Sequence, residues 1–238
     1  MHNNKKKTRF FIYIIKIHVI INIEKIKEAF MASSIIHLAV AKKVSEKISI
    51  TNIKDYYIGS IAPDISRQIG ESKEISHFQR NSRNNTPNIE LFIMKYPDFK
   101  HNDFELGYFV HLYTDKLWEE EFINNISHEK CIKSDDGTYL EVTREEMKDM
   151  IYSDYTNINK ELIDDYNIDL SIFYEEYVEP KSDMTEVPTD KLDILINKMG
   201  ILIENSKEEK PYSFDIKSIE DFIDHTVEKI EERLKEVR

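Results

Sequence analysis

Apolar residues recur at intervals of three and four along most of the chain, and this spacing constrains the fold more than any other feature. The clearest run follows a capping box, in which Thr143 precedes Glu146 by three residues, a signature of a helix N-terminus. The apolar residues of this run recur at helical spacing: Met147, Ile151, Tyr155, Ile158, Leu162 and Ile163. Only five glycines and six prolines occur among 238 residues, which disfavours a turn-rich fold. We therefore predict a single all-α domain over residues 31–238.

Other segments carry shorter forms of the same signal. Outside the run already described, we expect helices over about 33–48, 52–60, 86–96, 103–125, 189–205 and 216–237. Pro63 disfavours helix at the residue before it, so Asp64 is expected at a turn that ends the second of these helices. The polar stretch 65–85 is expected to be mostly loop. One small β-hairpin is predicted near 131–143, with its turn at Asp136-Gly137.

The first 30 residues differ in composition from the rest. A basic start followed by an apolar run resembles a signal peptide or a membrane anchor, but a lysine and a histidine interrupt the run and no small-residue cleavage site follows. The apolar pieces are shorter than the roughly 20 residues of a spanning helix. The codons for residues 27–29 can form a purine-rich ribosome-binding sequence. We therefore expect Met31 to be the natural start and residues 1–30 to be a leader; the alternative is a disordered or amphipathic extension that touches a membrane weakly.

Charge is unevenly distributed along the chain. The net charge is −12, and the first 30 residues, with seven Lys/Arg and two Glu, carry +5, which leaves −17 on residues 31–238. Such an acidic body is not expected to bind nucleic acid without a basic groove or a bound cation, and no such groove is evident. The single cysteine, Cys131, cannot form an internal disulfide, which favours a reducing compartment. We predict a cytoplasmic protein without stable membrane insertion.

The helix predicted over 103–125 carries two polar residues within an aromatic and apolar stripe. His111 and Asp115 are four residues apart, so one face of the helix presents both side chains. The pair alone allows two interpretations. Either both residues bind a cation, or a core histidine is hydrogen-bonded to the carboxylate.

Three further residues of metal-ligand type stand in unusual settings upstream. His37 interrupts the apolar run SSIIHLAVA, Asp64 follows a helix end in IGSIAPDI, and His77 lies between apolar residues in ISHF. Each has a structural alternative: respectively a satisfied core histidine, a turn or capping residue, and a loop residue. Together with His111 and Asp115 they supply three imidazoles and two carboxylates, a donor set that suits zinc.

Four segments, in their order and spacing, resemble the bacterial zinc-dependent phospholipase C family, in particular its small clostridial and bacillar members. They are SSIIHLAVAKK, YYIGSIAPDI, ISHF and LGYFVHLYTDKLW. The resemblance begins at Met31, is distinct to about Glu121 and continues more loosely toward the C-terminus. It implies an all-α fold with zinc ions bound in a cleft between helices.

The resemblance also implies ligands and an activity. Asp64, His77, His111 and Asp115 would bind one zinc ion, and Asp115 would bridge to a second ion that His37 also binds. The implied substrates are phosphate diesters, such as phospholipid head groups or small phosphate esters. A related branch of the family cleaves single-stranded nucleic acid. We therefore predict a zinc-dependent phosphodiester hydrolase with one or two zinc ions.

The sequence departs from the toxin-like members in two ways. Those members begin with a tryptophan whose amino group binds metal, and neither Met1 nor Met31 provides this group. They also use further histidines and a His-x-x-x-Glu helix for a third zinc ion. Here His225 is the only histidine after His128, and Lys229 stands four residues beyond it. One or two ions is the expected count.

Three arginines near the predicted ligands are candidates for binding phosphate in a forked geometry, the alternative being ordinary solvated charges: Arg67, Arg80 and Arg83. Two other functions remain open. One is a non-catalytic helical binding protein that a metal stabilises, and the other is a related zinc nuclease, which the acidic surface disfavours. A His-Asp-domain phosphohydrolase is excluded because no histidine directly precedes an aspartate.

Overall fold

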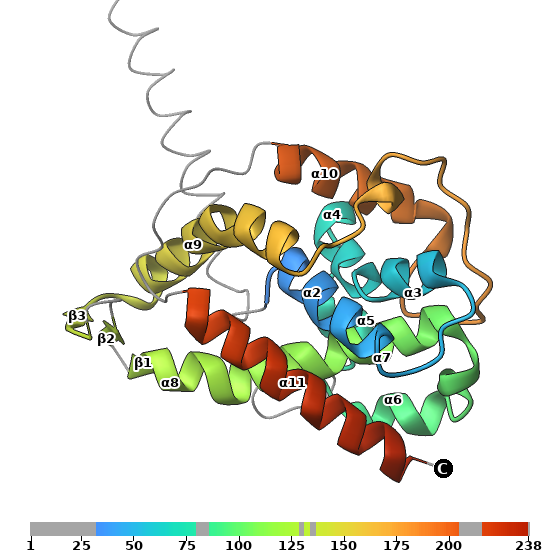
Figure 1. The fold of residues 1–238 in the computed structure, drawn as a ribbon, viewed down its shortest axis with the longest axis horizontal. Helices are drawn as coiled ribbons and strands as arrows, with labels where there is room; N and C mark the ends of the chain where they lie inside the picture. Colours follow the sequence, from blue (N-terminus) through green and yellow to red (C-terminus); the bar gives the residue numbers. More distant parts are fainter. Residues whose placement is uncertain (1–31, 80–85, 129–130, 134–136, 205–215, 238) are drawn as a thin grey trace, which may run out of the picture. The chain divides into compact units, whose positions relative to one another are not determined.

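A computed structural model describes residues 32–79, 86–128, 131–133, 137–204 and 216–237 of the chain. They belong to the second of two compact units, Met31–Arg238; the first, Met1–Phe30, lies outside the described residues, as do the predictions made for it. The described part is predominantly helical (Figure 1), which confirms the predicted all-α class. None of its helices is long and apolar enough to cross a membrane.

The helices follow the predicted segments closely. They are α2 (Ser34–Ser45), α3 (Ile53–Gly59), α4 (Ile65–Ile69), α5 (Lys73–Ser76), α6 (Ile89–Lys95), α7 (Asp103–Leu117), α8 (Asn124–Ile126), α9 (Arg144–Asp165), α10 (Leu192–Glu204) and α11 (Ile216–Glu236). Short 3-10 turns lie between them: η1 (Ala62–Asp64), η2 (Phe99–His101), η4 (Ser171–Phe173) and η5 (Thr189–Lys191). A π-helical segment, η3 (Trp118–Ile123), continues α7. The capping box at Thr143 is present at the start of α9.

The stretch 65–85 departs from the sequence prediction. The sequence favours mostly loop, but α4 and α5 lie within it. Gly70, with φ of 74°, ends α4 in a left-handed conformation. The side chain of Ser72 accepts a hydrogen bond from the backbone of Glu74 and so caps α5. Both helices are too short to show an apolar repeat, which is why the pattern missed them.

A small antiparallel sheet contains the predicted hairpin. Strand β2 (Cys131–Lys133) pairs with β3 (Tyr139–Glu141), with Ile132 opposite Leu140. A third strand, β1 (Ser127–His128), pairs with β2 and was not predicted. Gly137 has φ of 85°, as a tight turn requires, whereas Asp136 lies outside the described residues.

Helix α2 lies deep in the described part of the fold. It packs against α7, α9 and α11 (Figure 1), and its residues from Ile35 to Ala41 are all buried. A helix that is apolar on every side is a core helix rather than a surface one. The side chain of Ser33 caps its first turn by accepting from the backbone N–H of Ile36 at 3.2 Å. His37 therefore lies in a helix with almost no access to solvent.

Helices α3 and α7 meet backbone to backbone. A Cβ added to Gly59 would lie 2.0 Å from the carbonyl oxygen of Phe104, and one added to Gly107 would lie 2.0 Å from that of Tyr56. Only glycine fits at so close a crossing. The crossing brings the carbonyl of Ser60, which directly follows α3, against α7.

Substitution at this crossing should be costly. We expect Gly107→Ala to lower the free energy of unfolding by about 2–3 kcal/mol, because the added methyl group meets fixed backbone. A Cβ on Gly200 in α10 would meet its nearest neighbour, the Cβ of Phe173, at an ordinary 3.7 Å, so Gly200→Ala is the matched control. It is expected to be neutral or stabilising by up to about 1 kcal/mol. Urea unfolding compares the two, and equal stability of both variants would contradict the close crossing.

Candidate metal centre

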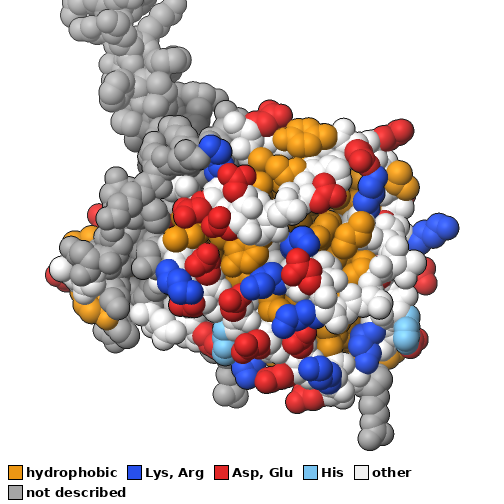
Figure 2. Space-filling view, in the orientation of Figure 1, with side chains coloured by type: hydrophobic (Ala, Val, Ile, Leu, Met, Phe, Trp, Pro, Cys, Tyr) orange, Lys and Arg blue, Asp and Glu red, His pale blue; other side chains and the backbone are white. Residues whose placement is uncertain are grey.

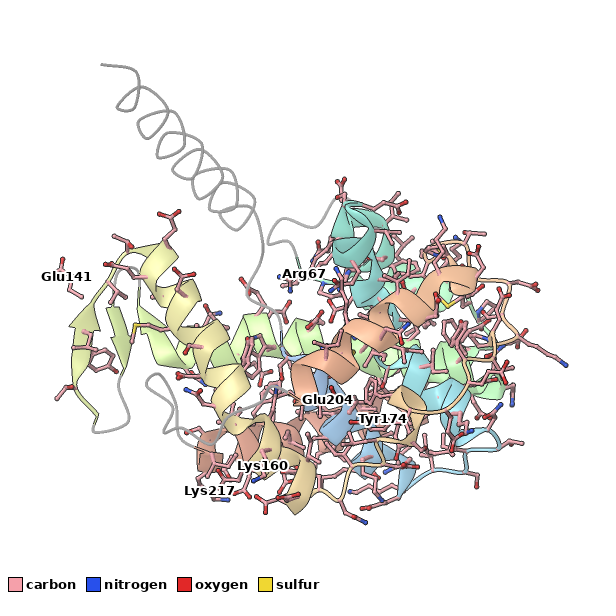
Figure 3. The ribbon with its side chains drawn as sticks, turned by 90° about the horizontal axis from the view of Figure 1, so that it is seen from above. Arg67, Glu141, Lys160, Tyr174, Glu204 and Lys217 are labelled. Carbon is pink, nitrogen blue, oxygen red and sulfur yellow. The ribbon has the colours of Figure 1, made fainter. Side chains whose placement is uncertain are left out.

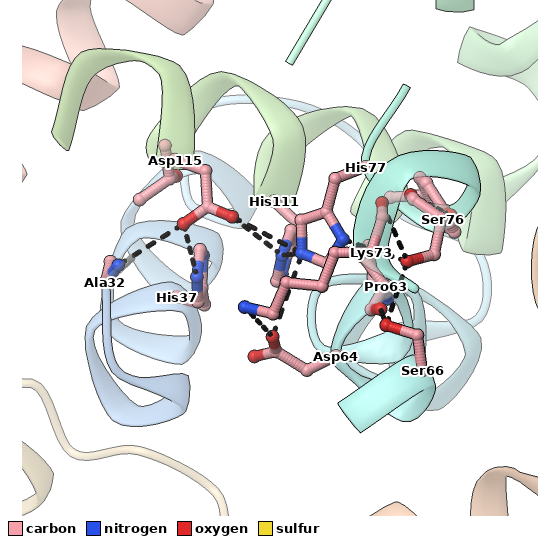
Figure 4. A network of polar contacts seen from close by, with 12 residues as sticks. Ala32, His37, Pro63, Asp64, Ser66, Lys73, Ser76, His77, His111 and Asp115 are labelled. Atoms are coloured by element: carbon pink, nitrogen blue, oxygen red, sulfur yellow. Dashed lines mark hydrogen bonds and ion pairs between the residues drawn. The ribbon is translucent and has the colours of Figure 1, made fainter. Parts of the chain in front are cut away.

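Five side chains of metal-ligand type meet in one buried polar cluster (Figure 4). The members of this His–Asp cluster are His37 from α2, Asp64 from η1, His77 at the end of α5, and His111 and Asp115 from α7. The three histidines are 0% exposed, Asp115 is 2% exposed and Asp64 is 7% exposed. The structure thus brings together all five residues that the sequence singles out as ligands.

The donor atoms of the cluster have the spacing expected around a small cation. His111 Nε2 lies 3.3 Å from His77 Nε2 and 3.2 Å from Asp115 Oδ2. His77 Nε2 lies 3.6 Å from Asp115 Oδ2 and 3.7 Å from Asp64 Oδ1. Ligand atoms about 2.0–2.1 Å from a tetrahedral zinc ion are about 3.3–3.4 Å from one another. The donor atoms of His77, His111 and Asp115 therefore match three corners of such a coordination shell, and Asp64 lies beside His77.

The far ring nitrogens of two histidines are already hydrogen-bonded. His111 Nδ1 lies 2.9 Å from the carbonyl oxygen of Ser60, which can only accept, so Nδ1 carries the hydrogen. His77 Nδ1 lies 2.9 Å from Ser76 Oγ, whose own hydrogen is directed to Ser66 Oγ at 3.1 Å. Both Nε2 atoms then present lone pairs to each other at 3.3 Å. Such a pair repels unless a proton or a metal ion lies between the two atoms, and metal-binding histidines are commonly oriented in this way.

Several atoms of the cluster have no hydrogen-bond partner among the described residues. They are both ring nitrogens of His37, Oδ1 of Asp64 and Oδ2 of Asp115. His37 Nε2 lies 3.2 Å from Asp115 Oδ1 without the geometry of a hydrogen bond. A buried polar group without a partner costs about 1–3 kcal/mol. A cation would satisfy the two carboxylate oxygens and the ring nitrogen of His37 that carries a lone pair, so the donor set fits a metal ion.

The two oxygens of Asp115 point to different sides of the cluster. Oδ1 accepts from the backbone N–H of Ala32 at 3.3 Å and faces His37. Oδ2 faces His77 and His111. The ring of His37 stacks on that of His111 with centroids 3.8 Å apart. One carboxylate therefore reaches two adjacent sets of imidazole nitrogens.

The charges of the cluster are strongly coupled. Burial lowers the pKa of His37 and of His77, the latter to about 4, so both rings are neutral. Burial alone would raise the pKa of Asp64, but the neighbouring imidazole of His77 and the charge of Lys73 hold it well below its usual range. The pKa of His111 is raised despite its burial, because the Asp115 carboxylate lies beside it.

Acid should therefore destabilise the metal-free protein. Between pH 6.5 and about 4, the unfolded chain binds a proton at His77 that the folded protein rejects, so stability rises with pH in this window. His77 alone predicts a loss of about 2 kcal/mol between about pH 7 and about pH 5. His37 adds to the loss, whereas His111 is protonated in both states at the acid end. Urea unfolding in chelator measures the slope, and His77→Gln should make it shallower; a slope that does not change would contradict this account.

Sequence reasoning missed one charged neighbour of the cluster, Lys73. Its Nζ lies 3.7 Å from Asp64 Oδ1. It precedes His77 by four residues, and the backbone N–H of His77 donates to the carbonyl of Lys73 at 2.8 Å. The i, i+4 spacing was readable in the sequence, but it carries meaning only in a helix, and this stretch was predicted to be loop.

The residue after His77 has an unusual backbone. Phe78 has φ of 52°, in the left-handed region that bulky residues avoid. Such a conformation costs about 1–3 kcal/mol. The ring of Phe78 packs edge-on against Phe92, Tyr96 and Tyr108, which offsets the cost. Phe78 thus ends the turn of α5 and directly follows His77, a candidate metal ligand.

The other candidate residues of the sequence analysis are not part of the His–Asp cluster or fall outside the described residues. Arg67 is exposed on α4 (Figure 3), and its role in phosphate binding stays a prediction. Arg80 and Arg83 fall outside the described residues. His225 is partly exposed and pairs with Glu121 at 2.9 Å, away from the five clustered side chains.

Comparison with known proteins adds no assignment. A scan against protein-family models and searches of curated proteins and of solved structures found no match for the chain. What the fold and the site define is a class: an all-α protein with a buried cluster of three histidines and two aspartates that fits a metal ion.

Proposed function

We propose that the protein is a zinc-dependent hydrolase of phosphate diesters, similar in chemistry to zinc-dependent phospholipase C. One observation carries the proposal: the five members of the His–Asp cluster, drawn from four separate elements, bring their ring nitrogens and carboxylate oxygens together, and atoms of three of them have no hydrogen-bond partner among the described residues. The likeness of four sequence segments to that family supports the choice of reaction. The donor set of imidazole and carboxylate supports the choice of zinc.

The family resemblance implies two ligand groups within the cluster, whereas the donor atoms that lie within 4.8 Å of one another are those of His77, His111 and Asp115 and those of His37, Asp64 and His111. Asp64, His77, His111 and Asp115 would hold one ion, and His37 with the other oxygen of Asp115 would contribute to a second. When bound, zinc supplies a water ligand with a pKa near neutrality and positive charge for the phosphoryl oxygens. The count of one or two ions stays as the sequence predicts.

The chain's own contribution is to fix the donors before a metal arrives. The carbonyl of Ser60 and the hydroxyl of Ser76 hold the rings of His111 and His77 in the tautomer that leaves Nε2 bare. Because these partners orient the ligands, their loss typically weakens metal binding about 10- to 100-fold. Asp64 lies at the rim, with its side chain 11% exposed, and substrate would approach from that side.

The surface favours a small phosphate ester or a lipid head group over nucleic acid. Figure 2 shows acidic and basic side chains interspersed on one face, without a basic stripe there. A nucleic-acid backbone is bound mainly through such clustered cations. The net charge of −17 on residues 31–238 acts in the same direction.

A non-catalytic role is the second candidate, and the depth of the site favours it. Four of the five cluster residues are at most 2% exposed, so a bound ion would have little contact with solvent. In that case the metal would only stabilise the helices of a binding protein.

Metal analysis of the full chain, paired with an assay panel, separates these functions. We expect one or two zinc ions per chain by inductively coupled plasma mass spectrometry. Among chromogenic phosphate mono- and diesters, diesters should be turned over, chelation should stop the reaction, and added zinc should restore it. Bound zinc without turnover of any ester would favour the non-catalytic role, and a metal-free protein would exclude both.

A further inference from the structure

A chain of buried hydroxyl groups connects the ring of His77 with the segment that carries Asp64. Ser76 Oγ lies 2.9 Å from His77 Nδ1 and 3.1 Å from Ser66 Oγ. Ser66 Oγ in turn lies 3.4 Å from the carbonyl oxygen of Pro63, the residue before Asp64. Ser66 is 3% exposed and Ser76 is 1% exposed, so protein atoms rather than bulk water supply their partners. Figure 4 shows this chain of contacts, the serine relay, beside the His77 ring.

The direction of the hydrogen bonds in the serine relay is set at its carbonyl end. The oxygen of Pro63 can only accept, so Ser66 directs its hydrogen there. Ser66 Oγ then accepts the hydrogen of Ser76. Ser76 therefore has no hydrogen left for the ring and accepts one from His77 Nδ1. A neutral ring with its hydrogen on Nδ1 and a protonated ring both donate in this way, so the order does not depend on the charge of His77.

Ser66 is the acceptor that keeps the hydrogen of Ser76 away from the ring. The only other acceptor that the described contacts give Ser76 is the carbonyl of Lys73, at 3.5 Å, and this carbonyl already accepts from the backbone N–H of His77 at 2.8 Å. Without the Ser66 hydroxyl, the nearest acceptor for Ser76 would be His77 Nδ1 at 2.9 Å. The ring would then carry its hydrogen on Nε2, which faces His111 Nε2 at 3.3 Å.

We propose that Ser66 is a positioning residue of this site, which acts through Ser76 to hold the ring hydrogen of His77 on Nδ1 and to leave Nε2 bare. The inference rests on the proposed function for its purpose and deepens it, because Ser66 is two hydrogen bonds away from the ring. Ser66 lies on α4 and follows Asp64 by two residues. The serine relay thus joins the segment of one candidate ligand to the ring of another.

The position of the ring hydrogen can be measured without any metal. Nitrogen NMR of the full chain, labelled at histidine and kept in chelator near neutral pH, distinguishes a protonated from a bare ring nitrogen, and His77→Gln assigns the signals. The parent protein should carry the hydrogen of His77 on Nδ1. Ser66→Ala should move it to Nε2, and Ser76→Ala, which breaks the next contact of the relay, should do the same. Ser45→Ala is the matched control, because Ser45 Oγ also donates to the carbonyl three residues before it, that of Lys42 at 2.7 Å.

Zinc affinity gives the companion result. Loss of a partner that orients a metal ligand typically weakens metal binding about 10- to 100-fold, so Ser66→Ala should bind zinc more weakly by that factor and Ser45→Ala should match the parent protein. If Ser66 acts only through Ser76, the double variant Ser66→Ala/Ser76→Ala should bind zinc as weakly as Ser76→Ala alone. Competition with a chelator of known affinity measures all of these variants.

The possible outcomes separate this inference from the function on which it rests. Hydrogen on Nε2 of His77 in the parent protein, or on Nδ1 in Ser66→Ala, would overturn the inference while leaving zinc binding and hydrolysis intact. Losses of zinc affinity that add in the double variant would also overturn it, since Ser66 would then support the fold independently of Ser76. A parent protein that binds no zinc would remove the proposed function, whereas the ring hydrogen of the metal-free chain would still decide the role of Ser66.

Discussion

Asp115→Ala is expected to abolish zinc binding and to reduce phosphodiester turnover at least about 1000-fold, since the bound metal supplies several kcal/mol of transition-state stabilisation. Both oxygens of this carboxylate face imidazole nitrogens: Oδ1 lies 3.2 Å from His37 Nε2, and Oδ2 lies 3.2 Å from His111 Nε2. The substitution thus removes a donor from each possible ligand group at once.

The measurement needs two companion variants. Asp115→Asn keeps the volume and removes the charge, so it should lose zinc as Asp115→Ala does, which separates metal ligation from packing. Asp224→Ala is the control, because Asp224 is 54% exposed and pairs with Lys43 on the surface. Plasma mass spectrometry gives zinc per chain. Full zinc content in Asp115→Ala would exclude Asp115 as a ligand and remove the main support for the proposed function.

Chelation is expected to lower the melting temperature by about 10 °C. A ligand present at about 1000 times its dissociation constant stabilises the folded state by about 4 kcal/mol. For a domain of about 200 residues, each kcal/mol is worth about 2–4 °C. The effect should be large here because the metal-free cluster keeps unsatisfied buried atoms on His37, Asp64 and Asp115. Thermal unfolding followed by circular dichroism, with and without chelator, gives the shift.

The matched control for chelation is the same treatment of Asp115→Ala. The melting temperature of this variant should be the same with and without chelator. Zinc added back should restore the melting temperature of the parent protein only. If the melting temperature of the parent protein is also the same with and without chelator, the cluster is held together by its own protons and hydrogen bonds. Turnover assays on the same samples decide whether a stabilising metal is also catalytic.

Long elements could be predicted from sequence because their apolar repeat reports burial directly. The stripe in α7 and the capping box of α9 are examples. Short elements could not be predicted: α4 and α5 contain five and four residues, less than the length over which periodicity shows. The π-helical turn that begins at Trp118 has no sequence signal at all, because it reflects how the end of α7 packs rather than which residues it contains.

The cluster could be anticipated from residue chemistry, but its surroundings could not. His37 and His111 stand out because a histidine in an apolar run needs a partner. The Ser60 carbonyl that orients His111 is a backbone atom, which no composition or spacing argument reveals. Lys73 was missed for the same reason as its helix. Arg67 is exposed on α4, and its role in phosphate binding stays a prediction.

The close crossing of α3 and α7 at Gly59 and Gly107 bears on which ion the proposed metal site would accept. The crossing fixes the separation of α3 and α7. It therefore also fixes the position of the Ser60 carbonyl, which is hydrogen-bonded to His111 and so sets the distance of the His111 ring from His77. Zinc forms bonds of about 2.0–2.1 Å, whereas calcium requires about 2.3–2.6 Å and more oxygen ligands. If an ion binds at the cluster, two hydrogen atoms in place of two methyl groups would thus help to set the ionic radius that the ligands can accommodate.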